Sequence, residues 1–301
     1  MGPRRRRPRQ KTRSSTAPDK KAAVIEDPRK ALEVSRGWHR EGLSVGLVPT
    51  MGARHAGHLS LVEQACREND RVVVSIFVNP IQFGPGEDFD RYPRDPERDS
   101  ALLASAGVDA IYRPAVAAMY PPGSSTRIHV AGVSEPLEGK ARPEHFDGVA
   151  TVVAKLFAAV EPDRAYFGQK DAQQVAVVRR MALDLDLPVE IRVGPTVREP
   201  DGLALSSRNA YLTPEERQAA ASLSSALRLA AEAYTRGERE PDRLRQILRQ
   251  RLEAEPLAKV EYAELVDPEK FTAPGSLAVL AVRVGRTRLI DNHDITKEFP
   301  G

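Results

Sequence analysis

Apolar and polar positions along this chain of 301 residues change repeatedly between the spacing of strands and that of helices. Short apolar runs predict strands at 43–48, 71–78, 109–112, 164–167 and 189–193. Helical spacing predicts helices at 28–40, 59–67, 95–106, 146–160 and 173–185. This order of strand and then helix predicts an α/β fold with a Rossmann-like parallel sheet and helices on both faces. Ligands of such sheets bind at the carboxyl ends of the strands.

The pattern changes near residues 195–207, where a loop-like run contains Pro200, Asp201 and Gly202. Thr213 and Pro214 then provide a helix cap and a first-turn proline, which predicts the start of a long alanine-rich helix. A second helix is expected at 241–254, and strands at 260–265, 277–282 and 287–290. We therefore expect a Rossmann-like domain at 23–195 and a smaller C-terminal α+β lid domain at 196–301.

Composition narrows the class of protein. The chain is 41% hydrophobic, enough for a buried core, but no apolar run approaches the roughly 20 residues needed to cross a bilayer. The N-terminus lacks the apolar segment of a secretory signal, and Cys66 is the only cysteine, so no internal disulfide can form. These features favour a cytoplasmic protein without a membrane partner.

The first 22 residues carry nine Lys or Arg side chains against one Asp, so the rest of the chain is net acidic. A basic run without apolar periodicity predicts a disordered arm at 1–22. Such an arm is either a solvated tail or a nonspecific contact for a polyanion such as nucleic acid.

The strongest candidate for chemistry is His55-Ala56-Gly57-His58, which follows Met51 and Gly52 between the first core strand and its helix. Glycines allow close approach of a nucleotide, a helix N-terminus favours phosphate, and imidazoles can donate to phosphoryl oxygens. A tight turn with two surface histidines remains an alternative. A metal pair is another, although no third Cys, His, Asp or Glu lies nearby at zinc-like spacing.

A second candidate is the run from Leu205 through Ser206 and Ser207 to Arg208, which offers two hydroxyls and a guanidinium to a triphosphate. Alone, this run is also typical of a helix-capping loop. Paired with the histidine motif upstream, it matches the signature of nucleotidyl-transfer enzymes related to class I aminoacyl-tRNA synthetases.

Three further polar clusters lie at predicted strand ends or before a helix. They are Asn79 with Gln82, the run 168–174, and Arg142 with His145. Each alone is more typical of a capped helix start than of a binding site. Because the carboxyl ends of parallel strands share one edge of a sheet, their joint position predicts a shared cleft.

Together these segments resemble the pantothenate synthetase (pantoate–β-alanine ligase) family of the HxGH nucleotidyltransferase superfamily. The resemblance runs from about residue 23 to Asn292 and rests on the stretches 46–52, 55–62, 75–83, 142–146, 167–171 and 196–209. It implies a homodimeric enzyme whose small-molecule substrates are ATP, pantoate and β-alanine. In that family, pantoate and ATP, assisted by Mg²⁺, give pantoyl adenylate and diphosphate, and β-alanine then gives pantothenate and AMP, the route to coenzyme A.

The resemblance also implies residue roles. His58 is expected to be the proton donor, with His55 beside it on the phosphates, and Gln82 and Gln174 are expected to bind pantoate, Gln82 also facing β-alanine. The expected ATP-binding residues are Met51, Gly52, His55, Gly57, His58, Gly168, Gln169, Lys170, Asp171, Val197, Leu205, Ser206, Ser207 and Arg208. The resemblance extends less directly to Asn79, Tyr92, Arg142 and His145. The metal ligands are not specified.

Two other functions fit parts of the sequence. One is a different HxGH nucleotidyltransferase that makes a dinucleotide or a CDP-activated group. The other is a nucleic-acid-binding protein that acts through the basic arm.

We expect deletion of residues 1–22 to abolish any polyanion binding but to leave ligase turnover unchanged, because no catalytic motif lies in the arm. Binding to a fluorescent oligonucleotide and the rate of AMP release, measured on both chains, would check this. Loss of turnover in the shortened chain would contradict the assignment of the motifs.

Overall fold

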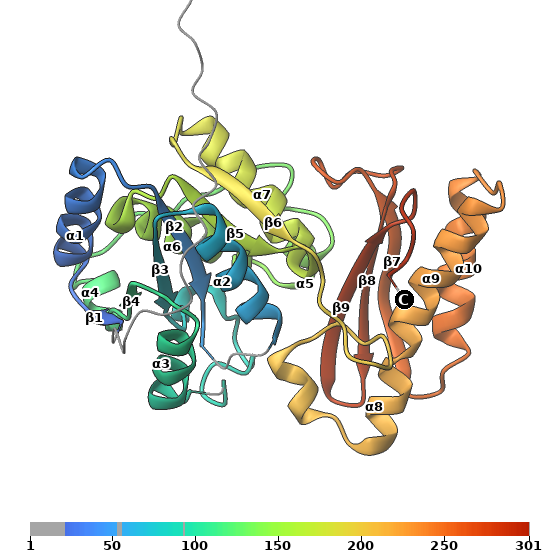
Figure 1. Cartoon of the computed structure of the whole chain (residues 1–301). Coiled ribbons are helices and arrows are strands. Elements are labelled where there is room, and N and C mark those ends of the chain that lie inside the picture. Colours follow the sequence, from blue (N-terminus) through green and yellow to red (C-terminus); the bar gives the residue numbers. More distant parts are fainter. Residues whose placement is uncertain (1–21, 53–55, 93, 301) are drawn as a thin grey trace, which may run out of the picture.

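The computed structural model describes residues 22–52, 56–92 and 94–300. Figure 1 shows two units side by side, a larger one from blue to yellow and a smaller one from orange to red. The larger unit contains a six-stranded sheet in the order β1-β4-β3-β2-β5-β6, in which every pair is parallel. Its strands are β1 (Ala23–Ile25), β2 (Val45–Thr50), β3 (Arg71–Ile76), β4 (Ala110–Tyr112), β5 (Arg164–Gly168) and β6 (Glu190–Gly194). The predicted Rossmann-like parallel sheet is confirmed, and β1, which the pattern did not predict, extends one edge.

Alternate residues of the strands face two separate apolar clusters. Leu47 and Val73 pack with one group of helices, whereas Val48 and Val74 pack with the other. This alternation follows from the two-residue period of a strand and explains why both faces of the sheet are covered. The first group comprises α1 (Pro28–Arg40), α6 (His145–Val160) and α7 (Ala172–Asp184), and the second comprises α2 (Ala56–Glu68) and α3 (Pro96–Ser105).

The first core strand was predicted at 43–48, with its end before Pro49. That end was wrong, because β2 continues to Thr50 and stays paired with β3. The backbone N–H and C=O groups of one strand residue point toward one neighbouring strand, and those of the next residue point toward the strand on the other side. The carbonyl of Thr50 accepts from Phe77 N on the β3 side, so the nitrogen of Pro49 faces the β5 side. Since β2 pairs with β5 only through Gly46 and Leu47, the missing N–H of Pro49 removes no bond of the sheet.

The smaller unit contains the antiparallel sheet β7-β8-β9 and three helices. The long helix expected after Thr213 is instead two helices. Thr213 forms the expected capping box with Glu216, but at Ala221 the helix tightens to a bond from Ala221 N to Gln218 O. The elements are β7 (Ala258–Val266), β8 (Leu277–Val284), β9 (Thr287–Asp294), α8 (Pro214–Ala220), α9 (Ser222–Thr235) and α10 (Pro241–Glu253).

Strand β8 is buried on both faces. Ala278 and Leu280 pack with the helices of the smaller unit, whereas Leu277 and Val279 join the core cluster of the larger unit. The small sheet therefore packs between its own helices and the first unit, as the position of β8 in Figure 1 illustrates.

Short helical turns carry several of the functional segments. They are η1 (Pro80–Gln82), α4 (Val116–Met119), α5 (Glu138–Ala141), η2 (Gln169–Asp171) and η3 (Ser207–Tyr211). Within the described ranges, no helix has the length and apolar character of a membrane span.

Candidate active site

A cavity of about 210 Å³ opens where the chain order of the parallel sheet reverses, between β2 and β5. The carboxyl ends of parallel strands are the expected ligand site at such a reversal. Most of the residues predicted for substrate binding line it: Met51, Gly57, His58, Gln82, Tyr92, Gly168, Lys170, Asp171, Gln174, Val197, Leu205, Ser206, Ser207 and Arg208.

The segment after β2 leads directly to this cavity. Gly52 has a left-handed φ of 88°, and a Cβ at this position would lie 2.9 Å from a carboxylate oxygen of Asp99, so only glycine fits without strain. Gly57 and His58 follow in the first turn of α2, where backbone N–H groups favour anions. His55 lies outside the described residues, so its predicted contact with the phosphates stays a prediction.

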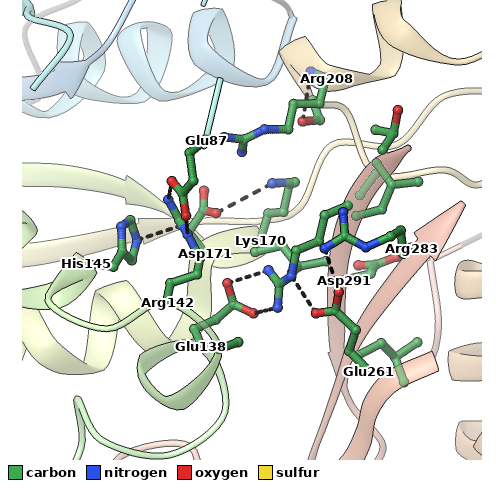
Figure 2. Close-up of a pocket in the computed structure, with 18 of the residues that line it drawn as sticks. Glu87, Glu138, Arg142, His145, Lys170, Asp171, Arg208, Glu261, Arg283 and Asp291 are labelled. Carbon is green, nitrogen blue, oxygen red and sulfur yellow. Dashed lines mark hydrogen bonds and ion pairs between the residues drawn. The ribbon is translucent and has the colours of Figure 1, made fainter. Parts of the chain in front are cut away.

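The turn η2 after β5 brings Lys170 and Asp171 to the same cavity, with the Lys170 Nζ 3.5 Å from an Asp171 carboxylate oxygen (Figure 2). Partial burial alone would raise the pKa of Asp171. The charges of Lys170, His58 and Arg208 outweigh this effect and lower that pKa, so the carboxylate is ionised at neutral pH. The side chain of Gln169 points elsewhere and donates to Asn292 of β9.

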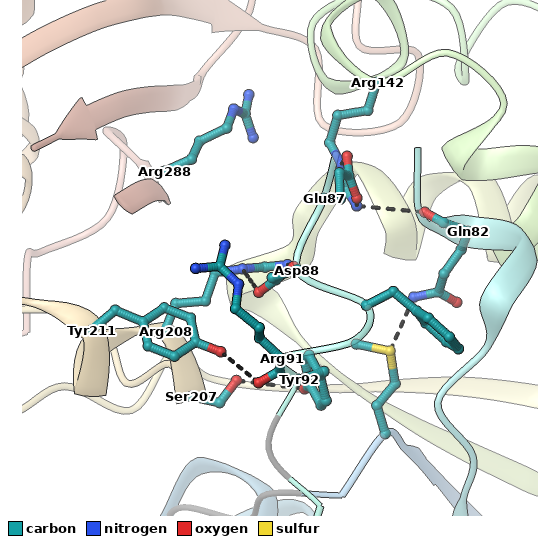
Figure 3. Close-up of polar contacts among 12 residues, drawn as sticks. Gln82, Glu87, Asp88, Arg91, Tyr92, Arg142, Ser207, Arg208, Tyr211 and Arg288 are labelled. Carbon is teal, nitrogen blue, oxygen red and sulfur yellow. Dashed lines mark hydrogen bonds and ion pairs between the residues drawn. The ribbon is translucent and has the colours of Figure 1, made fainter. Parts of the chain in front are cut away.

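The predicted loop of the smaller unit contacts residues 84–92, which follow β3. Arg208 forms a two-point ion pair with Asp88 at 3.0 and 2.8 Å, and the hydroxyls of Ser207 and Tyr92 lie 3.4 Å apart (Figure 3). Asp88 was missed by the sequence analysis. Its only local signal was a run of two acidic residues after the Gly-Pro-Gly segment at 84–86.

Gln82 is held firmly within the larger unit. Its side-chain oxygen accepts from Asn79 at 3.0 Å, and its side-chain nitrogen lies 3.1 Å from the Met51 sulfur. Gly148 of α6 allows the backbone of Gln82 to approach, because a Cβ there would lie 2.7 Å from the Gln82 Cα. Asn79 thus supports Gln82 from behind the cavity.

Arg142 and His145 lie in an adjoining cleft of about 1010 Å³, which shares Lys170, Asp171 and Gln174 with the smaller cavity. Arg142 forms a two-point ion pair with Glu87 at 2.7 and 2.6 Å. His145 Nδ1 lies 2.8 Å from the carbonyl oxygen of Gln82.

The partners of His145 define its tautomer. Because a carbonyl only accepts, Nδ1 carries the proton, and Nε2 at 3.0 Å accepts from the Arg142 guanidinium. Burial, together with the positive charge of Arg142, lowers the pKa of His145 to about 4. This imidazole is therefore a neutral acceptor near pH 7.

The same cleft contains a buried carboxylate that was not predicted from the sequence. Glu138 of α5 accepts two hydrogen bonds from Arg288 of β9, at 2.7 and 2.6 Å, and a third from Tyr262 of β7 at 2.7 Å. Burial alone would raise the pKa of Glu138, but the hydrogen bonds and charge of Arg288 lower it. These contacts join the two units, as Figure 2 shows for Glu138.

Comparison with known proteins agrees with this arrangement. A family model described as pantoate-beta-alanine ligase matches residues 23–294. The chain belongs to the pantoate–β-alanine ligase family. Membership of this family, and with it the predicted class of enzyme, a ligase, is confirmed.

Relatives of this family match along most of their length. The pantothenate synthetase of Roseiflexus sp. (strain RS-1) is 59% identical over 254 residues, which cover 83% of this chain and 91% of the relative. The crystal structure of pantothenate synthetase from Thermus thermophilus superposes with a TM-score of 0.85 at 48% identity, over 91% of this chain and 100% of that one. The ligase of Francisella tularensis, complexed with beta-gamma ATP and beta-alanine, has a TM-score of 0.76 at 33% identity, over 93% and 100% of the two chains.

We expect His145 to stay neutral as the pH falls from about 7 to about 5. The unfolded chain takes up this proton at the usual pKa of 6.5, so the stability that the neutral imidazole contributes is complete above 6.5 and is lost as the pH falls toward about 4. NMR of the imidazole nitrogens would measure the titration. The Arg142→Gln variant should raise the pKa of His145 only partly, because burial of the imidazole remains. Titration of His145 near pH 6.5 in the wild-type chain would refute the prediction.

Proposed function

We propose that this chain catalyses the ATP-dependent condensation of (R)-pantoate with β-alanine to pantothenate, through pantoyl adenylate, and so supplies a coenzyme A precursor. The observation that carries the proposal is the meeting of the segments after β2, β3 and β5 with the 205–208 loop at one cavity. The Francisella tularensis relative, solved with beta-gamma ATP and beta-alanine, supports the choice of substrates.

In the proposed first step, a pantoate carboxylate oxygen bonds to the α-phosphorus of ATP and the bond to the β-phosphate oxygen breaks, which releases diphosphate. Such a reaction needs positioning and charge stabilisation rather than a protein nucleophile. We assign His58, at the N-terminus of α2, to donate to the phosphoryl oxygens with His55 beside it. Lys170 and Arg208 provide positive charge at the same cavity.

We assign the other predicted residues to the nucleotide and to the two remaining substrates. Gln82 and Gln174 bind pantoate through neutral amides, which fix hydroxyls and a carboxylate without added charge. In the second step the β-alanine amine attacks the acyl carbon, AMP leaves, and the amine loses a proton. The nucleotide contacts are assigned to Met51, Gly52, Gly57, Gly168, Asp171, Val197, Leu205, Ser206 and Ser207. Gln169 is assigned a contact through its backbone, because its side chain donates to Asn292.

We propose that Mg²⁺ arrives as part of the ATP complex. Among residues 22–52, 56–92 and 94–300, no group of three His, Cys, Asp or Glu side chains is placed to hold a metal ion. Mg²⁺ commonly binds to substrate phosphates with few protein ligands. We therefore assign no step to a protein-bound metal.

We propose three further assignments. The homodimer rests on the resemblance to the family, whereas the cytoplasmic location and the domain boundary near residue 195, with the smaller unit acting as a lid, rest on the sequence pattern. The end of β6 at Gly194 and the start of the second set of elements at Pro214 support that boundary.

Product analysis tests the function directly. The purified chain supplied with MgATP, pantoate and β-alanine should release AMP and pantothenate in equal amounts, which chromatography can quantify. Omission of β-alanine should leave diphosphate release from a single turnover only. AMP release that does not depend on β-alanine would refute the proposal. Formation of a dinucleotide or of a CDP-activated product would show another HxGH nucleotidyltransferase instead.

The role of His58 can be tested by single-turnover adenylation. We expect His58→Ala to slow this step roughly 10²- to 10³-fold, because it removes a hydrogen bond that strengthens as charge develops on the phosphate. His39→Ala is a suitable control, since His39 pairs with Asp163, which directly precedes the amino end of β5, whereas the cavity lies at the carboxyl ends of the strands. A near-normal adenylation rate in His58→Ala would exclude the role.

A further inference from the structure

Asn292, near the end of β9, holds the backbone of a turn that belongs to the other unit. Its side-chain nitrogen donates to the carbonyl oxygens of Gln169 at 3.0 Å and Lys170 at 2.8 Å. Its side-chain oxygen accepts from the Gln169 amide at 3.1 Å. Asn292 is only 4% exposed, so water does not compete with these bonds.

The preceding residue, Asp291, holds a different segment. It forms a two-point ion pair with Arg198 at 2.6 and 3.1 Å, and Arg198 also donates to the carbonyl of Gly202 at 3.0 Å. Leu205 N donates to Val197 O, so Arg198 lies in a narrow hairpin. Both Arg198 and Asp291 are almost fully buried.

The geometry of β9 explains how two adjacent residues reach two segments. Successive side chains of a strand point to opposite faces. Asn292 pairs with Val279, which packs toward the larger unit, whereas Asp291 pairs with Leu280, which packs toward the helices of the smaller unit. Figure 2 shows Asp291 on this strand across the cleft from Asp171.

The two segments form two walls of the proposed nucleotide cavity. One wall is the turn with Gly168, Lys170 and Asp171, and the other includes Val197 and Leu205. We infer that Asn292 is a positioning residue that fixes the turn η2 against β9, while Asp291 fixes the opposite wall. The pair thereby sets the spacing of the ATP site. This inference rests on the proposed function.

The chemical consequence follows from the carbonyls that Asn292 engages. They belong to the two residues directly before Asp171, so their direction fixes where Lys170 and Asp171 enter the cavity. A displacement of about 1 Å in such groups can cost on the order of 10²-fold in rate. Of the two amides assigned to pantoate, Gln82 is held by contacts within the larger unit alone. Gln174 follows the turn but lies on α7, whose apolar side chains pack in the core of the larger unit, so neither amide is held by Asn292.

The test is Asn292→Asp, which keeps the shape of the side chain but turns a carboxylate oxygen toward two carbonyls. We expect kcat/KM for ATP in adenylation to fall roughly 10- to 100-fold. The affinity for pantoate alone, measured by calorimetry, should stay within about twofold. Asn292→Ser, which keeps one hydroxyl donor, should show a smaller loss in kcat/KM for ATP. This variant replaces Asn292→Asp in the test if the Asp variant does not fold.

The matched control is Asn69→Asp. Asn69 is also buried and its side-chain nitrogen donates to the carbonyl of Ala65, but it lies beside the amino end of β3. The Asn69→Asp variant should have a lower melting temperature than the wild-type chain but no selective loss in kcat/KM for ATP. A normal kcat/KM for ATP in a folded Asn292 variant, or equal losses for ATP and pantoate, would overturn the inference. Failure of the wild-type chain to make pantothenate would instead refute the proposed function.

Discussion

The site depends on the early divergence of β2 from β5. These strands pair only through Gly46 with Arg164 and Leu47 with Ala165. Pro49 presents no N–H toward β5, so it offers no donor that would extend this pairing, although the pairing of β2 with β3 continues to Thr50. The strand ends therefore separate where the chain order of the sheet reverses, and the cavity occupies the space between them.

Charge is arranged around this cleft in pairs. Arg142 is paired with Glu87, Arg208 with Asp88, and Arg288 with Glu138. A buried charge is costly unless a partner and hydrogen bonds compensate for its lost hydration, and each of these guanidinium groups has a two-point partner. Two of the three pairs join elements of both units, so the same charges that line the cleft also fix the relative position of its walls.

The sequence predicted those parts of the fold and site whose signal is local. Helices α1 and α6 are strongly periodic and were predicted nearly to the residue, and both chemical motifs lie at the cavity as far as the described residues extend. Glu138 and Asn292 had no such signal, and Asp88 had only its place in a run of two acidic residues, because each acts on a residue distant in the chain. Glu138, for example, meets Arg288 across 150 positions. Strand β1 was missed for the same reason, since it gains its bonds from the remote β4.

The two halves of the proposed site differ in how they are built. Gln82 is fixed by Asn79, Met51 and His145, and by the close approach of α6 at Gly148, all within the larger unit. The proposed nucleotide walls instead come from both units and meet through β9. A shift of the smaller unit would therefore change the spacing of the nucleotide walls while the amide of Gln82 stayed in place. In the proposed reaction, binding of the acid substrate and activation of its carboxylate are thus separable physical tasks.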